Sequence, residues 1–331
     1  MPNLKDVARI AEVNISTVSR YLSGKLNVTP GVEQRIIQAI QETGYQPNII
    51  AQSLRSGINP TIAVVVPDIY QPGISGIISG IDDYLNNTEY ALTMAMTKGS
   101  AARELEILKN FRQLMVAGVI VIGHPFGERN PVQALKEAIG ENIPMTFVSR
   151  NFRKSAVSEV CPDQEMGVVL LTQHLIERGY KSIGVIVGRR DHPDAVVKLR
   201  GFKKVLDSNG METCAQCVEE GFYRSQETRA AVDRLIQQNI EAIICASDNM
   251  AVSAAQYLQE KGFSIPRDIA ITGYGGTIWA EIYSPRLTTV DAKVEKLGIT
   301  AAELLDQHIQ HPENPARLVV QPVDLKIGKT T

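Results

Sequence analysis

The chain lacks the features that direct a protein to a membrane or to an oxidising compartment. Its 331 residues hold only four cysteines, which do not form the dense pattern of a disulfide framework. No apolar run reaches the length of a membrane-spanning helix, and the first residues, MPNLKDVARI, have no apolar signal-peptide core. We therefore expect a cytoplasmic protein that has no membrane-bound part.

Catalytic and metal-binding motifs are also missing from the sequence. It contains no G-x-S-x-G, H-E-x-x-H or Walker phosphate loop, and the GYGG at 273–276 lacks the third glycine of a dinucleotide loop. Cys214 and Cys217 form a lone C-x-x-C, and His308 and His311 form a lone pair. Neither pair has the further ligands that a metal site needs. We expect no enzyme activity, no metal and no cofactor.

The start of the chain contains two short amphipathic helices. Between Leu4 and Gly24, apolar residues recur at helical spacing in two groups, which a polar turn at Asn14 separates. The small side chains of Ala8 and Ala11 allow the two helices to cross closely. This is the layout of a helix-turn-helix, whose second helix enters the major groove of DNA.

A third helix and a linker are expected to follow. Thr29-Pro30 is typical of a helix start, and Gly44 is typical of a helix end. The buried stripe of this helix is expected to consist of Ile36, Ile37, Ile40 and Tyr45. Residues 46–57 resemble a linker that is helical only when something stabilises it. Residues 1–58 have a small excess of basic over acidic side chains, whereas the remainder is net acidic, as expected if only one end meets phosphate.

From Thr61 onward, apolar strands alternate with helices. The expected strands are 61–67, 117–123, 144–149, 182–188, 242–247 and 268–275. The expected helices are Ile74–Leu85, Ala101–Met115, Met166–Arg178, Leu199–Asn209, Glu227–Gln238 and Met250–Lys261. This alternation predicts doubly wound parallel sheets, in two halves that meet near residue 160. Leu287–Ile309 is expected to return the chain to the first half. Ligands of such sheets bind beyond the carboxyl ends of the strands.

Several segments, in order along essentially the whole chain, resemble the lactose-repressor (LacI/GalR) family. They are LKDVARIAEVNISTVSRYL, NVTPGVEQRIIQAIQETGYQPNIIAQSLRSG, PDIYQP, SDNMAVSAAQYLQEKGFSIPRDIAITGYGG and SPRLTTV. The resemblance implies an α/β fold: an N-terminal all-α helix-turn-helix headpiece and a periplasmic-binding-protein-like body of two doubly wound parallel-sheet subdomains. It implies a transcriptional repressor of carbohydrate-utilisation genes, whose operator affinity a small effector controls.

The resemblance also implies a division of the chain into domains. Residues 1–46 would be the DNA-binding domain, 47–59 the hinge helix or linker, and 60–331 the effector-binding and dimerisation domain. Within this body, the N-subdomain is expected at about 60–160 and 290–320, and the C-subdomain at about 161–289 and 321–331. The sequence has no C-terminal leucine heptad, so a homodimer is expected, with a palindromic operator in double-stranded DNA.

On the family template, the recognition helix is Ile15–Leu22. The positions expected to meet base edges are Ile15, Ser16 and Arg20, and those expected to hold phosphates are Thr17 and Ser19. Arg20 suits guanine and Ile15 suits a thymine methyl, although Ile15 could belong to the core instead. The matched hinge positions are Asn48, Ala51 and Leu54. Leu54 would wedge between base steps in the minor groove, or else pack against the body.

The resemblance places an effector pocket between the subdomains. The matching residues are Tyr70, Gln71, Gly73, His124, Arg150, Lys198, Phe222, Asp248 and Tyr274. The rings of Phe222 and Tyr274 suit the apolar face of a sugar. Asp248 suits hydrogen bonds to hydroxyl groups, or serves as a helix N-cap.

Two departures from the family pattern bear on the class of effector. Lys198 stands where the family has an arginine, and Gly275-Gly276 stand where it has two acids. With Arg150 retained and Arg189 and Arg190 near the rim, these changes predict a positive cleft and an anionic sugar, either a phosphate or an acid. The alternative is that the rim arginines are solvated and that Lys198 points outward.

Other functions share parts of this pattern. A catabolite-type regulator would answer to a protein corepressor docked on the outer face of the N-subdomain. An enzyme or a periplasmic sugar-binding protein could use the same body fold. The helix-turn-helix and the missing export signal argue against the last two.

Overall fold

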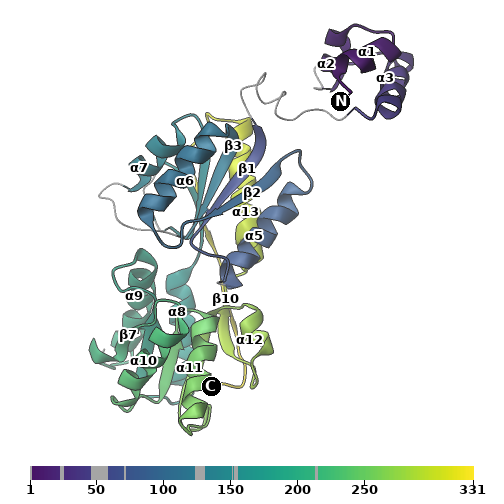
Figure 1. Ribbon diagram of the computed structural model, residues 1–331. Coiled ribbons are helices and arrows are strands. Elements are labelled where there is room, and N and C mark those ends of the chain that lie inside the picture. The colour runs from purple at the N-terminus through teal and green to yellow at the C-terminus, as the bar shows by residue number, and fades with distance from the viewer. Residues whose placement is uncertain are drawn as a thin grey trace. The chain divides into compact units, whose positions relative to one another are not determined.

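The computed structural model describes residues 2–22, 26–45, 59–70, 72–123, 131–150, 152, 156–212 and 215–331. Contacts divide the chain into two compact units, Met1–Asn59 and Pro60–Thr331. Figure 1 shows helices alone in the first unit and two sheets flanked by helices in the second.

The first unit is a cluster of three helices with well-defined ends. They are α1 (Leu4–Ile10), α2 (Ile15–Leu22) and α3 (Pro30–Thr43). The N-terminus of α1 has a capping box: Lys5 N donates to Asn3 Oδ1 at 2.9 Å, and Asn3 N donates to Asp6 Oδ2 at 3.0 Å. Gly44 ends α3 in the left-handed conformation, with φ +62°, which costs glycine little.

The core of this unit forms where the three helices cross. It consists of Val7, Ala8, Ala11, Val18, Ile36, Ala39 and Tyr45, with Ile40 packed against it. The prediction that Ile37 is buried is wrong, since this side chain is 44% exposed. Successive helical residues lie about 100° apart around the axis, so α3 cannot direct both Ile36 and Ile37 into the same core.

The second unit contains two six-stranded sheets, ordered β11-β5-β4-β3-β1-β2 and β12-β10-β9-β8-β6-β7. The first sheet has β1 (Asn59–Val66), β2 (Ala91–Met96), β3 (Val116–Ile122), β4 (Met145–Val148), β5 (Ser158–Pro162) and β11 (Leu318–Gln321). The second has β6 (Ile183–Val187), β7 (Val218–Glu220), β8 (Ala242–Cys245), β9 (Ala270–Gly275), β10 (Thr288–Asp291) and β12 (Asp324–Lys326). Strand pairing is parallel in both sheets, except that β12 runs antiparallel to β10.

Helices cover both faces of each sheet, which explains why the central strands are continuous apolar runs. The first sheet and its helices, here termed the N-subdomain, have α5 (Pro72–Leu85), α6 (Ala101–Gln113), α7 (Pro131–Ile139) and α13 (Val294–Gln310). The second sheet and its helices, the C-subdomain, have α8 (Gln164–Glu177), α9 (Pro193–Ser208), α10 (Ser225–Ile236), α11 (Asp248–Glu260) and α12 (Ile278–Ile282). A short 3₁₀ turn, η1, spans Ala215–Cys217.

The chain passes between the subdomains three times: from β5 to α8, from β10 to α13, and from β11 to β12. The expected break near residue 160 is in fact strand β5, and the chain changes sheet directly after it. Some strands, such as β2 (ALTMAM) and β7 (VEE), are not continuous apolar runs and were not predicted from the sequence. They lie at sheet edges, where burial is partial and apolar runs are not required.

Helices α5 and α13 approach each other closely because both carry a glycine at the contact. A Cβ atom on Gly80 would lie 1.9 Å from Glu295 O, and one on Gly298 would lie 2.0 Å from Ile77 O. No larger residue fits at either position without separating the helices. The contact fixes α13, which begins just after a crossing between the subdomains, against α5.

Candidate functional site

Helix α2 exposes side chains at its first turns. Ile15 is 46% exposed and therefore is not part of the core. Ser16 and Arg20 are also exposed, while Thr17 and Ser19 are half-buried. The Nε atom of Arg35 on α3 donates to Ala11 O at 3.0 Å, and Tyr21 OH donates to Glu33 at 2.8 Å. These bonds hold α2 and the turn before it against α3, so that the exposed side chains have a rigid support.

Some predicted site residues lie outside the described residues. They are the hinge positions Asn48, Ala51 and Leu54, and the effector positions Gln71 and His124.

A cleft of about 660 Å³ lies between the N-subdomain and the C-subdomain. It is at the carboxyl ends of the parallel strands of both sheets, as expected for this topology. Helices α5, α6, α8, α9 and α11 all begin at its walls, where the lining includes Gly73, Gly99, Gln164, His192 and Asn249. The positive ends of five helix dipoles therefore converge on one cavity.

Five of the predicted effector residues line this cleft, namely Tyr70, Gly73, Lys198, Phe222 and Tyr274. Tyr70 and Phe222 are exposed, at 88% and 42%, whereas Lys198 and Tyr274 are buried in the C-subdomain wall. The alternative that Lys198 points outward is therefore wrong.

Arg150 does not line the cleft. Its side chain is fully buried, and Nη1 and Nη2 donate to the two carboxylate oxygens of Glu104 at 2.8 and 3.0 Å. The guanidinium carbon lies 5.6 and 5.4 Å from the ring centroids of Phe147 and Phe152. Burial raises the pKa of Glu104, and the charge of Arg150 opposes that shift. Contrary to expectation, Arg150 contributes no free positive charge to the effector site.

Asp248 does not line the cleft either, and its side chain is buried. Its Oδ2 accepts hydrogen bonds from Thr277 N and Oγ1 at 2.7 and 2.8 Å, and its Oδ1 accepts one from Thr289 at 2.5 Å. Burial raises the pKa of Asp248, and these bonds oppose the shift. The N-cap of α11 is Ser247, one residue earlier, and Asn249 reaches the cleft instead. Asp248 therefore holds the loop after β9 in place.

Lys198 is enclosed by protein groups. Its Nζ donates to Asp194 Oδ2 at 2.9 Å and to Ala246 O at 3.3 Å, and it lies 4.4 Å from the ring centroid of Tyr274. Tyr223 OH donates to the same Asp194 oxygen at 3.0 Å. Burial alone would raise the pKa of Asp194, but Lys198 outweighs burial and the pKa is lowered. Lys198 and Asp194 therefore form a buried ion pair within the cleft wall, and their charges cancel.

His192 caps α9 beside this pair. Asp194 N donates to His192 Nδ1 at 3.1 Å, so the ring proton of the neutral imidazole resides on Nε2. Burial lowers the pKa of His192 to about 4, and the positive charge of Lys198 adds to the effect. The imidazole is therefore neutral at physiological pH.

Several cleft residues were not predicted from the sequence: Asp68, Lys98, Asp194, His192, Arg224 and Asn249. Lys98 and Arg224 follow strands β2 and β7, neither of which the apolar pattern revealed. Of the two rim arginines, Arg189 lines the cleft, whereas Arg190 Nη2 donates to Val218 O. Residues that follow a parallel strand line the cleft. Lys98 and Arg224 could therefore have been predicted if the edge strands β2 and β7 had been recognised in the sequence.

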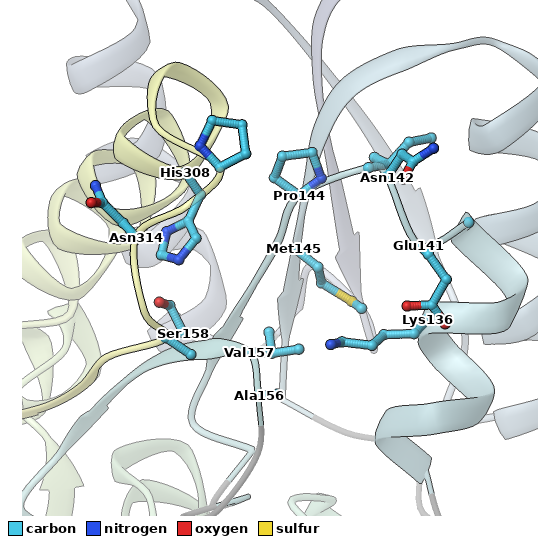
Figure 2. Close-up of a pocket in the computed structure, with 14 residues that line it drawn as sticks. Lys136, Glu141, Asn142, Pro144, Met145, Ala156, Val157, Ser158, His308 and Asn314 are labelled. Atoms are coloured by element: carbon cyan, nitrogen blue, oxygen red, sulfur yellow. The ribbon is translucent and has the colours of Figure 1, made fainter.

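A second pocket, of about 480 Å³, lies at the amino ends of β4 and β5, opposite the cleft (Figure 2). His308 lines it and donates from Nδ1 to Leu304 O at 2.8 Å, while His311 pairs with Glu313 at 3.5 Å. The two histidines therefore have separate partners. Within the described ranges, no three His, Cys, Asp or Glu residues are grouped as metal ligands would be. Among the same residues, no helix is long and apolar enough to span a membrane.

Comparisons with known proteins cover both units. Residues 3–48 match the family described as bacterial regulatory proteins, lacI family, and residues 172–331 match the periplasmic binding protein-like domain. The transcriptional repressor PurR of Aliivibrio salmonicida is 27% identical, over 96% of this chain and 95% of its own length. The ribose operon repressor of Haemophilus influenzae is 28% identical, over 97% of this chain and 96% of its own length.

Likeness to a solved structure extends over the whole chain. The lac repressor dimer bound to operator and the anti-inducer ONPF matches with a TM-score of 0.87 and 25% identity, covering 100% of this chain and 99% of that one. These relatives are transcriptional repressors and not enzymes. With its helix-turn-helix and its two-sheet body, the chain is a member of the LacI family, a DNA-binding transcriptional repressor that responds to a small effector.

Proposed function

We propose that this repressor controls carbohydrate-utilisation genes and binds a palindromic operator as a homodimer. Its effector is an anionic sugar derivative, a phosphate or an acid, in the cleft between the subdomains. Similarity to a ribose operon repressor supports a carbohydrate effector, and similarity to the operator-bound lac repressor dimer supports the mode of DNA binding. Helix α2 and the hinge positions Asn48, Ala51 and Leu54 are the proposed DNA contacts.

The charge balance of the cleft carries the proposal of an anionic effector. Its lining has the cations Lys98, Arg189, Lys198 and Arg224 and the carboxylates Asp68 and Asp194. The five helix N-termini add positive potential from both sides. Among the lining side chains positive charge is therefore in excess, even though the Lys198–Asp194 pair cancels internally and Asp191, outside the lining, pairs with Arg189.

An aromatic wall completes the site on the C-subdomain side. Phe222, Tyr223 and Tyr274 line the cleft together. Burial raises the pKa of Tyr223 and of Tyr274 well above 10, so both rings are neutral and present apolar faces. Such faces suit the C–H face of a sugar ring whose charged group points elsewhere.

Calorimetry with the purified full-length protein tests the effector. We expect glucose 6-phosphate, ribose 5-phosphate or gluconate to bind more tightly than its neutral parent sugar, because the cleft has excess positive charge. Tighter binding of the neutral sugars would contradict the anionic effector and leave the repressor function intact. If no sugar binds, a purine or a protein corepressor becomes the better candidate.

A substitution in α2 tests the mode of DNA binding. Arg20→Ala should lose about 1–3 kcal/mol of discrimination between the operator and a site with a single G·C pair replaced, since arginine reads guanine in the major groove. The operator is first selected from random DNA, and binding is measured by fluorescence anisotropy at fixed salt. Gln38→Ala, on the exposed side of α3, is the control. An equal loss of affinity for all sequences would assign Arg20 to phosphate contacts only.

A further inference from the structure

The four cations of the cleft differ in how far the protein already neutralises them. Lys198 gives its hydrogen bonds to Asp194 and Ala246 and lies against the Tyr274 ring. Arg189 is engaged by Asp191 through two bonds, Nε to Oδ1 at 3.0 Å and Nη2 to Oδ2 at 2.5 Å. A bidentate pair of this kind uses the face of the guanidinium that would otherwise bind an anion.

Lys98 and Arg224 have weaker interactions with the rest of the protein than Lys198 and Arg189 have. The side chain of Lys98 is exposed and makes no ion pair or hydrogen bond with any residue that the structure describes. The side chain of Arg224 is 75% exposed, and its ion pair with Glu227 is long, at 3.6 Å. An exposed pair at this distance contributes little and exchanges readily for a better partner.

The backbone fixes both residues at the cleft. Lys98 N donates to Pro67 O at 2.8 Å, and Arg224 N donates to Gly221 O at 2.8 Å. Lys98 has φ +52°, and the two residues before Arg224, Phe222 and Tyr223, have φ +49° and +58°. Left-handed backbone at non-glycine residues is unfavourable, so the surrounding structure must hold Lys98 and the two residues before Arg224 in these conformations.

We propose that Lys98 of the N-subdomain and Arg224 of the C-subdomain form a two-sided clasp for the anionic group of the effector, and that Lys198 is a positioning residue. This inference rests on the proposed anionic effector and names the residues that recognise its charge. Lys198 occupies the position at which the family has an arginine. Here its ammonium instead binds Asp194, and so orders Tyr223 and Tyr274 as the aromatic wall.

The clasp gives the anion a role in closing the cleft. Each subdomain supplies one cation, and two like charges that face the same cavity repel each other when it is empty. A phosphate or carboxylate between them replaces that repulsion with two attractions. Anion binding therefore favours the closed arrangement of the subdomains, whereas a neutral sugar lacks this contribution.

The test compares charged and neutral probes on the same variants of the full-length protein. Calorimetry uses glucose 6-phosphate with glucose, ribose 5-phosphate with ribose, and gluconate. Lys98→Gln and Arg224→Gln should each weaken binding of the anionic probe about tenfold or more, and leave the neutral sugar within about twofold. Lys203→Gln, an exposed lysine on α9 outside the cleft, should change neither.

Lys198→Met should weaken the neutral and the charged sugar by the same factor, because it disturbs the wall that both use. If this variant unfolds, Tyr223→Phe replaces it, since it removes the bond to Asp194 and keeps the ring. If Lys198→Met alone abolishes the preference for the anion while Lys98→Gln and Arg224→Gln retain it, the clasp is wrong and the anionic effector stands. If the wild type binds neutral sugars only, the anionic effector and the clasp both fail.

Discussion

Arg150→Met is expected to lower the free energy of unfolding by about 3–5 kcal/mol, because it leaves the buried carboxylate of Glu104 without its counter-charge. Both oxygens of Glu104 are bonded to Arg150, and the two side chains are 4% and 0% exposed. Both side chains are therefore shielded from bulk solvent. Urea unfolding followed by circular dichroism measures the effect.

A double variant distinguishes two causes of the lost stability, the unpaired buried charge and the loss of packing. Arg150→Met with Glu104→Gln should recover much of the loss, since no buried charge remains. The matched control is Arg200→Met, which breaks an exposed pair with Glu165 at 3.1 Å. It should cost less than about 1 kcal/mol. A double variant as unstable as Arg150→Met would show that packing between Phe147 and Phe152, and not charge, is responsible.

Acidification from pH 6.5 to 4 is expected to destabilise the body by up to about 3 kcal/mol through His192 alone. Burial lowers the pKa of this imidazole to about 4 in the folded state, whereas the unfolded chain has the ordinary value of 6.5. Between these values the unfolded state binds a proton that the folded state does not. Stability therefore rises with pH across this window, and each pKa unit is equivalent to about 1.4 kcal/mol.

The contribution of His192 is isolated by comparison with His192→Asn. Asparagine retains an acceptor for Asp194 N at the start of α9 but does not titrate. The difference in unfolding free energy between wild type and variant should decline as the pH falls from 6.5 to 4. Fluorescence of Trp279, the single tryptophan of the chain, reports on the unfolding of the C-subdomain. His311→Asn, at an exposed position, controls for the loss of an imidazole, and a difference that is constant with pH would refute the assignment.

The helices that the sequence predicted are those with a clear apolar period. The apolar period predicted a second short helix after the turn at Asn14, the family resemblance placed it at Ile15–Leu22, and α2 is found there. Of the six body helices that were predicted, five begin within two residues of the expected start, whereas α9 begins at Pro193 and not at Leu199. The first two turns of α9 contain Asp194 and Lys198, and charged residues in a buried wall conceal a helical period. Helices α7 and α12 were not predicted.

At the effector site, neither the sequence pattern nor the family resemblance was enough to predict which charged residues face the ligand. The family template placed Arg150, Lys198 and Asp248 against the ligand, and the chemistry of each residue type agreed with that role. Arg150 and Asp248 bind protein groups instead, at distances that satisfy them completely or nearly so. Their partners, Glu104, Thr277 and Thr289, lie 46, 29 and 41 residues away in the chain, beyond the reach of any local pattern.

The sequence by itself determined the helix-turn-helix, the alternation of strands and helices, and the family, because local periodicity and short motifs suffice for these features. Only the tertiary structure decided which charges of the cleft remain available. A charged side chain in a low-dielectric wall must find a partner, and that partner comes from whichever element the fold brings near. Lys198 meets Asp194 one helical turn away, whereas Lys98 and Arg224, brought to one cleft by two different sheets, remain open to a ligand.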